Sequence, residues 1–86
     1  MSFVAKDSQG RKFPTKKALI TLFKDGGPQD VVFRDLGYVH PRAGGSSFYR
    51  DGLRAGDTIE GPDPEREANK WYARVEMDKQ GNPTIR

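Results

Sequence analysis

The chain has 86 residues, a length that corresponds to one small domain spanning residues 1–86. A domain of this size buries only about 60% of the surface that its unfolded chain exposes, so we expect one thin core. The absence of cysteine excludes disulfide bonds, thiolate metal sites and a thiol nucleophile. The formal net charge of +3 is mild, and it fits a polyanionic partner as well as an ordinary solvated surface.

No signal peptide and no apolar run of membrane-spanning length is recognisable in the sequence. We therefore expect a cytoplasmic protein that has no membrane partner.

The first predicted element is a β-hairpin. Residues 2–6 alternate as a strand does and end in Asp7-Ser8-Gln9-Gly10, where glycine tolerates the positive φ of a tight turn. Residues 11–13 are predicted to form the returning strand. Pro14 ends it, because proline lacks the N–H donor that a strand ladder needs.

The next segment, residues 15–23, permits two interpretations. Thr15 is a good cap for a short helix that would end at Gly26 and Gly27. Against that, residues 18–23 are rich in apolar strand formers and have the length of a strand. We predict a strand here, and the helix is the alternative.

The remaining sequence predicts several short strands between turns and loops. Strands are expected at residues 30–34, 37–40, 57–60 and 70–77, with 83–86 as an edge strand or a loose tail, and loops at 41–51 and 62–69. A partly open barrel is economical at this length, because closure removes exposed sheet edges. The predicted fold class is therefore all-β, a small barrel of five to six strands.

Two segments resemble the end of the RNA-binding domain of transcription termination factor Rho, a cold-shock-like oligonucleotide-binding (OB) barrel. They are Gly52-Leu53-Arg54-Ala55-Gly56-Asp57-Thr58-Ile59-Glu60-Gly61 and, after a charged loop with prolines, Trp71-Tyr72-Ala73-Arg74-Val75. Tyr38-Val39-His40-Pro41 resembles the tyrosine-bearing strand that precedes this region in the family. The resemblance lies mainly in residues 37–76.

The chain departs from the family pattern in two places. The Gly-Phe-Gly-Phe element of the family is missing, and only Val32-Phe33-Arg34 stands near its position. Residues 42–49 also make the loop after Pro41 longer than the resemblance leads us to expect. The sequence has no Gly-rich phosphate loop ending in Lys-Ser or Lys-Thr, which excludes an ATP-driven translocase.

The resemblance implies that the domain binds single-stranded RNA or DNA, with a pyrimidine preference. It implies that Tyr38 and Trp71 stack on bases and that Lys70 contacts phosphate. Phe33 and Arg34 would then take the place of the missing aromatic element.

The alternation of residues 70–77 leads to a different assignment of the aromatic side chains. A period of two groups Trp71 with the apolar residues of this strand and places Tyr72 and Arg74 on the polar face. The pattern therefore predicts that Tyr72 and Arg74 contact the nucleic acid, whereas the resemblance predicts an exposed Trp71. Both aromatic residues remain candidates, and the alternative for each is a place in the core.

Phe48, Tyr49 and Arg50 suggest a second function. An aromatic loop with an arginine is a suitable anchor for a protein interface, so the alternative is a protein-interaction module, such as a small phage or bacterial regulator that docks on a larger enzyme and modulates it. The competing interpretation of this loop is that one of its aromatic rings folds back onto the barrel and has no partner to bind. The single histidine, His40, has no partnered nucleophile or metal-ligand spacing around it. We expect no enzyme activity, no metal and no cofactor.

Overall fold

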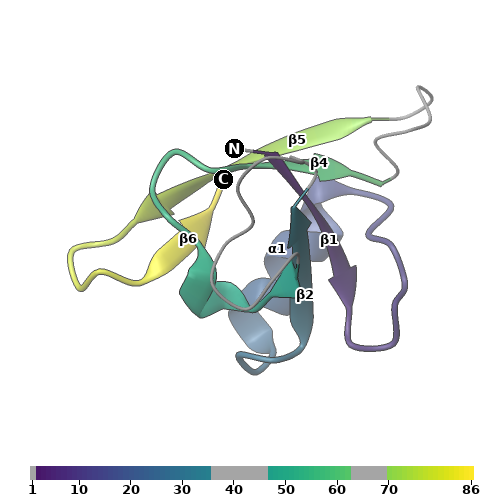
Figure 1. The fold of residues 1–86 in the computed structure, drawn as a ribbon, viewed down its shortest axis with the longest axis horizontal. Helices are drawn as coiled ribbons and strands as arrows, with labels where there is room; N and C mark the ends of the chain where they lie inside the picture. Colours follow the sequence, from purple (N-terminus) through teal and green to yellow (C-terminus); the bar gives the residue numbers. More distant parts are fainter. Residues whose placement is uncertain (1, 36–46, 63–69) are drawn as a thin grey trace.

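In the part of the chain that the structure describes, six strands form one sheet in the order β3-β2-β1-β4-β5-β6 (Figure 1). The computed structural model describes residues 2–35, 47–62 and 70–86. The elements, in chain order, are β1 Ser2–Asp7, α1 Lys16–Asp25, β2 Val31–Asp35, β3 Ser47–Phe48, the 3₁₀ turn η1 Arg50–Gly52, β4 Thr58–Gly61, β5 Trp71–Met77 and β6 Pro83–Ile85.

The amino-terminal strand β1 lies in the middle of the sheet. It pairs antiparallel with β2, where Val4 lies opposite Arg34, and parallel with β4, where Val4 lies opposite Glu60. The other neighbouring strands pair antiparallel. The strands predicted near residues 30–34, 57–60 and 70–77 are confirmed as β2, β4 and β5, and the edge strand at the end of the sequence is confirmed as β6.

Residues 16–25 form an α-helix, so the prediction of a strand here was wrong. The Thr15 hydroxyl oxygen accepts a hydrogen bond from the backbone N–H of Ala18 at 3.1 Å, which is a helix N-cap. At the other end, the N–H of Gly26 donates to the carbonyl of Leu22 at 2.7 Å. Leu19 and Phe23 are four residues apart and share one helix face, which gives the apolar residues a common direction toward the core.

The core lies between α1 and the inner face of the sheet (Figure 1). The ring of Phe48 meets that of Phe3 edge-on at 4.9 Å and stacks on that of Phe33 at 5.8 Å between centroids. Phe33 also meets Phe23 of the helix edge-on at 6.2 Å. Aromatic contacts of this kind add stability beyond the area that they bury. Ser47 and Phe48 were predicted to belong to a loop, and they instead form the short strand β3, which brings Phe48 into this cluster.

Two hairpin turns share one sequence pattern and one geometry. In Asp7-Ser8-Gln9-Gly10 the Asp7 carboxylate accepts from the N–H groups of Gln9 and Arg11 at 2.9 and 2.8 Å. In Asp78-Lys79-Gln80-Gly81 the Asp78 carboxylate accepts in the same way from Gln80 and Asn82, at 2.8 Å each. Gly10 and Gly81 have φ values of 82° and 81°, which favour glycine. The predicted turn at residues 7–10 is confirmed, and residues 78–81 form a second turn of the same kind.

The fold class is confirmed in part. The domain is dominated by its sheet, but it contains a helix, and in the described residues the sheet is not closed, with β3 and β6 at its two edges. The closed barrel and the OB fold are not confirmed. The strand predicted at residues 37–40 lies outside the described residues, as do most of the loops predicted at 41–51 and 62–69.

Candidate nucleic-acid interface

The strand β5 presents different side chains on its two faces. Ala73 and Val75 are buried in the core, whereas Tyr72 keeps 58% of its exposure and Arg74 is exposed. The alternation read from the sequence is therefore confirmed for this strand. Tyr72 is the most exposed of the large apolar side chains in the described residues, and we take it as the centre of the candidate interface.

Trp71 is half-buried and packs against the core rather than lying beside Tyr72. Its indole Nε1 donates a hydrogen bond to the backbone carbonyl of Phe13 at 2.9 Å. The ring also lies directly over Gly61, where any side-chain carbon would collide with it. The resemblance-based expectation of an exposed Trp71 is thus corrected, because both the polar group and one side of the ring are used by the fold.

Neighbouring strands place further polar groups around Tyr72. Glu60 of β4 lies opposite Tyr72, and Thr58 lies opposite Arg74. On the other side, Arg74 and Arg86 exchange two backbone hydrogen bonds, of 3.0 and 2.9 Å, so the two arginines stand side by side. Arg86 was not singled out from the sequence. Its position beside Arg74 depends on the register of β6 against β5.

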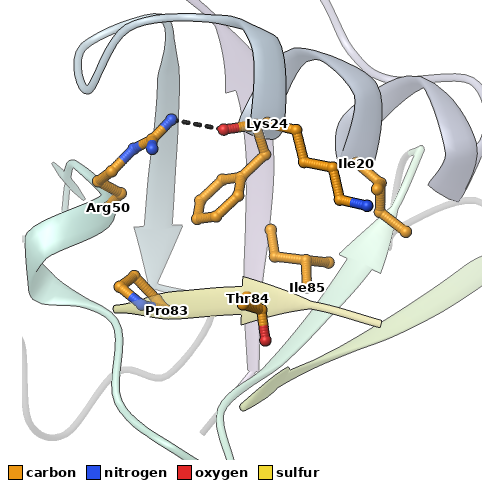
Figure 2. A pocket seen from close by; sticks show the side chains of 7 residues that line it. Ile20, Lys24, Arg50, Pro83, Thr84 and Ile85 are labelled. Atoms are coloured by element: carbon orange, nitrogen blue, oxygen red, sulfur yellow. Dashed lines mark hydrogen bonds between the residues drawn. The ribbon is translucent and has the colours of Figure 1, made fainter. Parts of the chain in front are cut away.

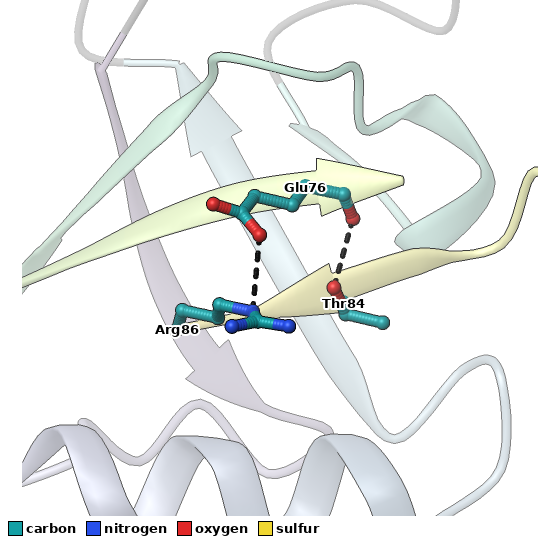
Figure 3. Close-up of polar contacts among 3 residues, drawn as sticks. All are labelled: Glu76, Thr84 and Arg86. Carbon is teal, nitrogen blue, oxygen red and sulfur yellow. Dashed lines mark hydrogen bonds and ion pairs between the residues drawn. The ribbon is translucent and has the colours of Figure 1, made fainter. Parts of the chain in front are cut away.

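Arg86 also forms an ion pair on this face. Its Nε lies 3.0 Å from Oε2 of Glu76, and the hydroxyl of Thr84 donates to the backbone carbonyl of Glu76 at 3.0 Å (Figure 3). Both members of the ion pair are largely exposed, so its contribution to stability is small. Its importance is local, because the pair neutralises the carboxylate nearest to Arg74 along β5.

We call this area the β5 surface. Its cationic and aromatic members are Lys70, Tyr72, Arg74 and Arg86, and its carboxylates are Glu60 and Glu76. Lys70, just before β5, is exposed as the phosphate contact requires. Three cations against two carboxylates, one of them in an ion pair, leave a modest positive surface around one exposed ring.

Arg34 lies farther away on the same side of the sheet. The register aligns Arg34, Val4, Glu60 and Tyr72 across four neighbouring strands. Three strand spacings separate Arg34 from Tyr72, which is about 14 Å. Val4 between them is buried at 6% exposure although it is not a member of the core cluster. The exposed cation of Arg34 is therefore separate from the β5 surface.

Phe33 does not belong to any surface. It retains 0% of its exposure and contacts the rings of Phe23 and Phe48. The prediction that Phe33 replaces an aromatic base-binding element is corrected, because β2 turns this residue inward and its neighbour Arg34 outward. Tyr38 and His40 lie outside the described residues, so the role of Tyr38 stays a prediction.

The three residues of the predicted protein-interface anchor, Phe48, Tyr49 and Arg50, have different environments in the fold. Phe48 is buried, and the Arg50 guanidinium lies 4.4 Å above the ring of Phe23. Arg50 Nη2 also donates to the backbone carbonyl of Phe23 at 2.7 Å and to that of Gly27 at 3.4 Å. Tyr49 alone of the three is exposed, at 41%. Two members of the predicted anchor therefore contribute to the fold instead.

Residues 2–35, 47–62 and 70–86 include no group of three or more histidine or carboxylate side chains arranged to hold a metal ion. They also include no helix with the length and apolarity that crossing a membrane requires.

Comparison of the chain with protein-family models, with curated proteins and with solved structures gave no match.

Proposed function

We propose that this domain binds single-stranded RNA or DNA on its β5 surface, in the cytoplasm and without catalysis. The observation that carries the proposal is the exposed ring of Tyr72, which stands on the outer face of a sheet strand with Arg74 and Lys70 beside it in the chain. Aromatic platforms flanked by cations are a common means of holding unpaired nucleotides.

Base stacking and phosphate attraction come from different side chains of the β5 surface. A base stacked on Tyr72 contributes about 1–3 kcal/mol and is tolerant of sequence, because every base has a flat face. Arg74, Arg86 and Lys70 attract the phosphates, and Glu60 lies across from Tyr72 on the neighbouring strand. Because the net positive charge is small, we expect affinities in the range of about 10⁻⁴–10⁻⁶ M at physiological salt.

The experiment is a fluorescence anisotropy titration of labelled single-stranded oligonucleotides, with duplex DNA of the same length for comparison. Tyr72→Ala is expected to weaken binding of single strands about 5- to 100-fold, which corresponds to the loss of one stacked base. Tyr72→Phe should bind almost as well as the unmodified protein, since it keeps the ring. Tyr49→Ala is the matched control, because it removes an exposed tyrosine outside the β5 surface.

Salt dependence tests the role of the cations. Replacing Arg74 by Gln should lower the slope of log affinity against log salt by about 0.7 if this side chain contacts one phosphate of a single strand. Equal binding by the Tyr72→Ala variant, or equal affinity for duplex and single strands, would contradict the proposed site.

Docking on a larger protein is the rival function, and the loop residues retain one exposed member for it, Tyr49. The same two variants separate the functions. A protein partner that is lost with Tyr49→Ala and retained with Tyr72→Ala would support the rival.

A further inference from the structure

A pocket of about 180 Å³ lies between the helix, the 3₁₀ turn and the last strand. Figure 2 shows Arg50 reaching it from one side and Ile20 and Lys24 from the other, above β6. Phe23 completes its apolar lining. Among the described elements β6 has one strand neighbour, β5, so the pocket lies near the open edge of the sheet.

The residues of β6 show where this pocket runs. Pro83, Thr84 and Ile85 all line it, yet consecutive side chains of a strand point to opposite faces. A pocket that touches all three therefore runs along the edge of the strand rather than over one face. The other edge of β6 is occupied by β5, so the pocket follows the unpaired edge.

The backbone of Ile85 turns its polar groups toward this edge. Arg74 and Arg86 exchange both of their hydrogen bonds, so the adjacent pair of Val75 and Ile85 is a non-hydrogen-bonded pair. The N–H and C=O of Ile85 consequently point away from β5, and in the described part of the chain neither has a partner. Ile85 keeps only 6% of its exposure, so a ligand that offers an acceptor oxygen at this edge would give its N–H the hydrogen bond that a buried backbone donor requires.

The charged groups of the pocket are cations. Lys24 and Arg50 line it, and among the described residues its lining includes no carboxylate. Arg50 uses Nη2 for the carbonyls of Phe23 and Gly27, which leaves the Nε and Nη1 donors of the fork unpaired within the described residues. Lys24 is exposed and has no ion-pair partner there. An anion attached to an apolar body would complement this combination.

We propose that this pocket binds a small-molecule carboxylic acid with an apolar body about the size of one aromatic ring. The apolar body lies against Phe23, Ile20 and Ile85, and the carboxylate accepts from the Ile85 N–H and is attracted by Lys24 and Arg50. The size follows from the volume, since a cavity of about 150 Å³ holds benzene. An extended peptide is a poorer occupant, because β6 has only three residues and begins with a proline, which leaves too few backbone groups on this edge for a strand ladder.

Phenylacetate is the probe, and phenylacetamide, which has the same shape without the charge, is the matched control. The full chain labelled with ¹⁵N and methyl ¹³C is titrated with each and followed by NMR at the Ile85 amide and at the methyl groups of Ile20 and Ile85. We expect saturable shifts at these positions with phenylacetate in the millimolar range, as is usual for a ligand of about ten heavy atoms. Phenylacetamide should bind at least about threefold more weakly, which is the effect of one partly exposed charge interaction.

Two lysines of α1 make the test specific. Lys24→Gln should weaken phenylacetate binding about threefold, and Lys17→Gln, which removes an exposed lysine that does not line the pocket, should leave it unchanged. Equal binding of acid and amide, shifts that map outside the pocket, or the absence of saturation at millimolar concentration would overturn the proposal.

Discussion

Two pairings of a cation with an aromatic ring behave in opposite ways in this domain. Arg50 lies over the ring of Phe23 and donates to backbone carbonyls at the end of α1, so it is part of the packing. Tyr72 and Arg74 stand on the outer face of β5, and both are exposed. The residue types are alike, and the difference comes from the strand register and from α1, which gives Arg50 carbonyl groups to bind. The residue types of a motif therefore indicate a binding surface only when the direction of their side chains is known.

The largest expected loss of stability comes from removing an aromatic ring that faces the core. Phe33→Ala should lower the free energy of unfolding by about 3–5 kcal/mol, because it removes a fully buried ring and leaves a cavity among Phe23 and Phe48. Urea denaturation followed by circular dichroism measures this change.

Tyr72→Ala is the outward counterpart and should change the same free energy by less than about 0.5 kcal/mol, as for most surface positions. If Phe33→Ala folds with unchanged stability and loses affinity for oligonucleotides instead, the division into inward and outward rings is wrong.

A loss of stability smaller than that of Phe33→Ala is expected for one of the two arginines, Arg50, and almost none for the other, Arg74. Arg50→Met should cost about 1–3 kcal/mol of stability, since it removes a charge-assisted hydrogen bond to the Phe23 carbonyl and the contact of the cation with the ring. Arg74→Met should leave stability nearly unchanged and should weaken oligonucleotide binding. Equal losses of stability in the two variants, measured in the same denaturation experiment, would remove the distinction between them.

Among the substitutions that remove a contact within the fold, the smallest loss of stability is expected at Trp71, and it separates the two neighbouring aromatic residues of β5. Trp71→Phe keeps a ring but removes the hydrogen bond from Nε1 to the Phe13 carbonyl, so we expect a loss of about 0.5–1.5 kcal/mol in stability. Affinity for single strands should stay the same in a protein that remains folded. A marked loss of affinity for single strands in this variant would indicate that Trp71 belongs to the nucleic-acid interface.

Local patterns were sufficient for much of this fold. The two Asp-x-Gln-Gly turns are recognisable because each needs only a short side chain that accepts from the backbone and a glycine at positive φ. The two faces of β5 followed from alternation, and they identified Tyr72 and Arg74.

The helix α1 was mispredicted although its signals are local. Residues 18–23 have strand propensity, but the Thr15 cap and the shared face of Leu19 and Phe23 favour a helix. Contacts between distant parts of the chain could not be predicted from such patterns. The role given to Phe33 came from the family resemblance, which does not fix which side of β2 faces the core. Arg86 enters the β5 surface only through the register of β6, since a shift by one residue would place it on the opposite face.

The central position of β1 has a consequence for how the chain assembles. One neighbour of β1 is β2, close by in the sequence, but the other is β4, more than fifty positions later, and this parallel pairing brings Ser2 next to Thr58. Pairings between such distant segments are slow to form, because a long loop must close before any contact is gained. A nascent chain that ends before β4 would leave one side of its first strand uncovered, so we expect the native sheet to form only after the second half of the chain has been synthesised.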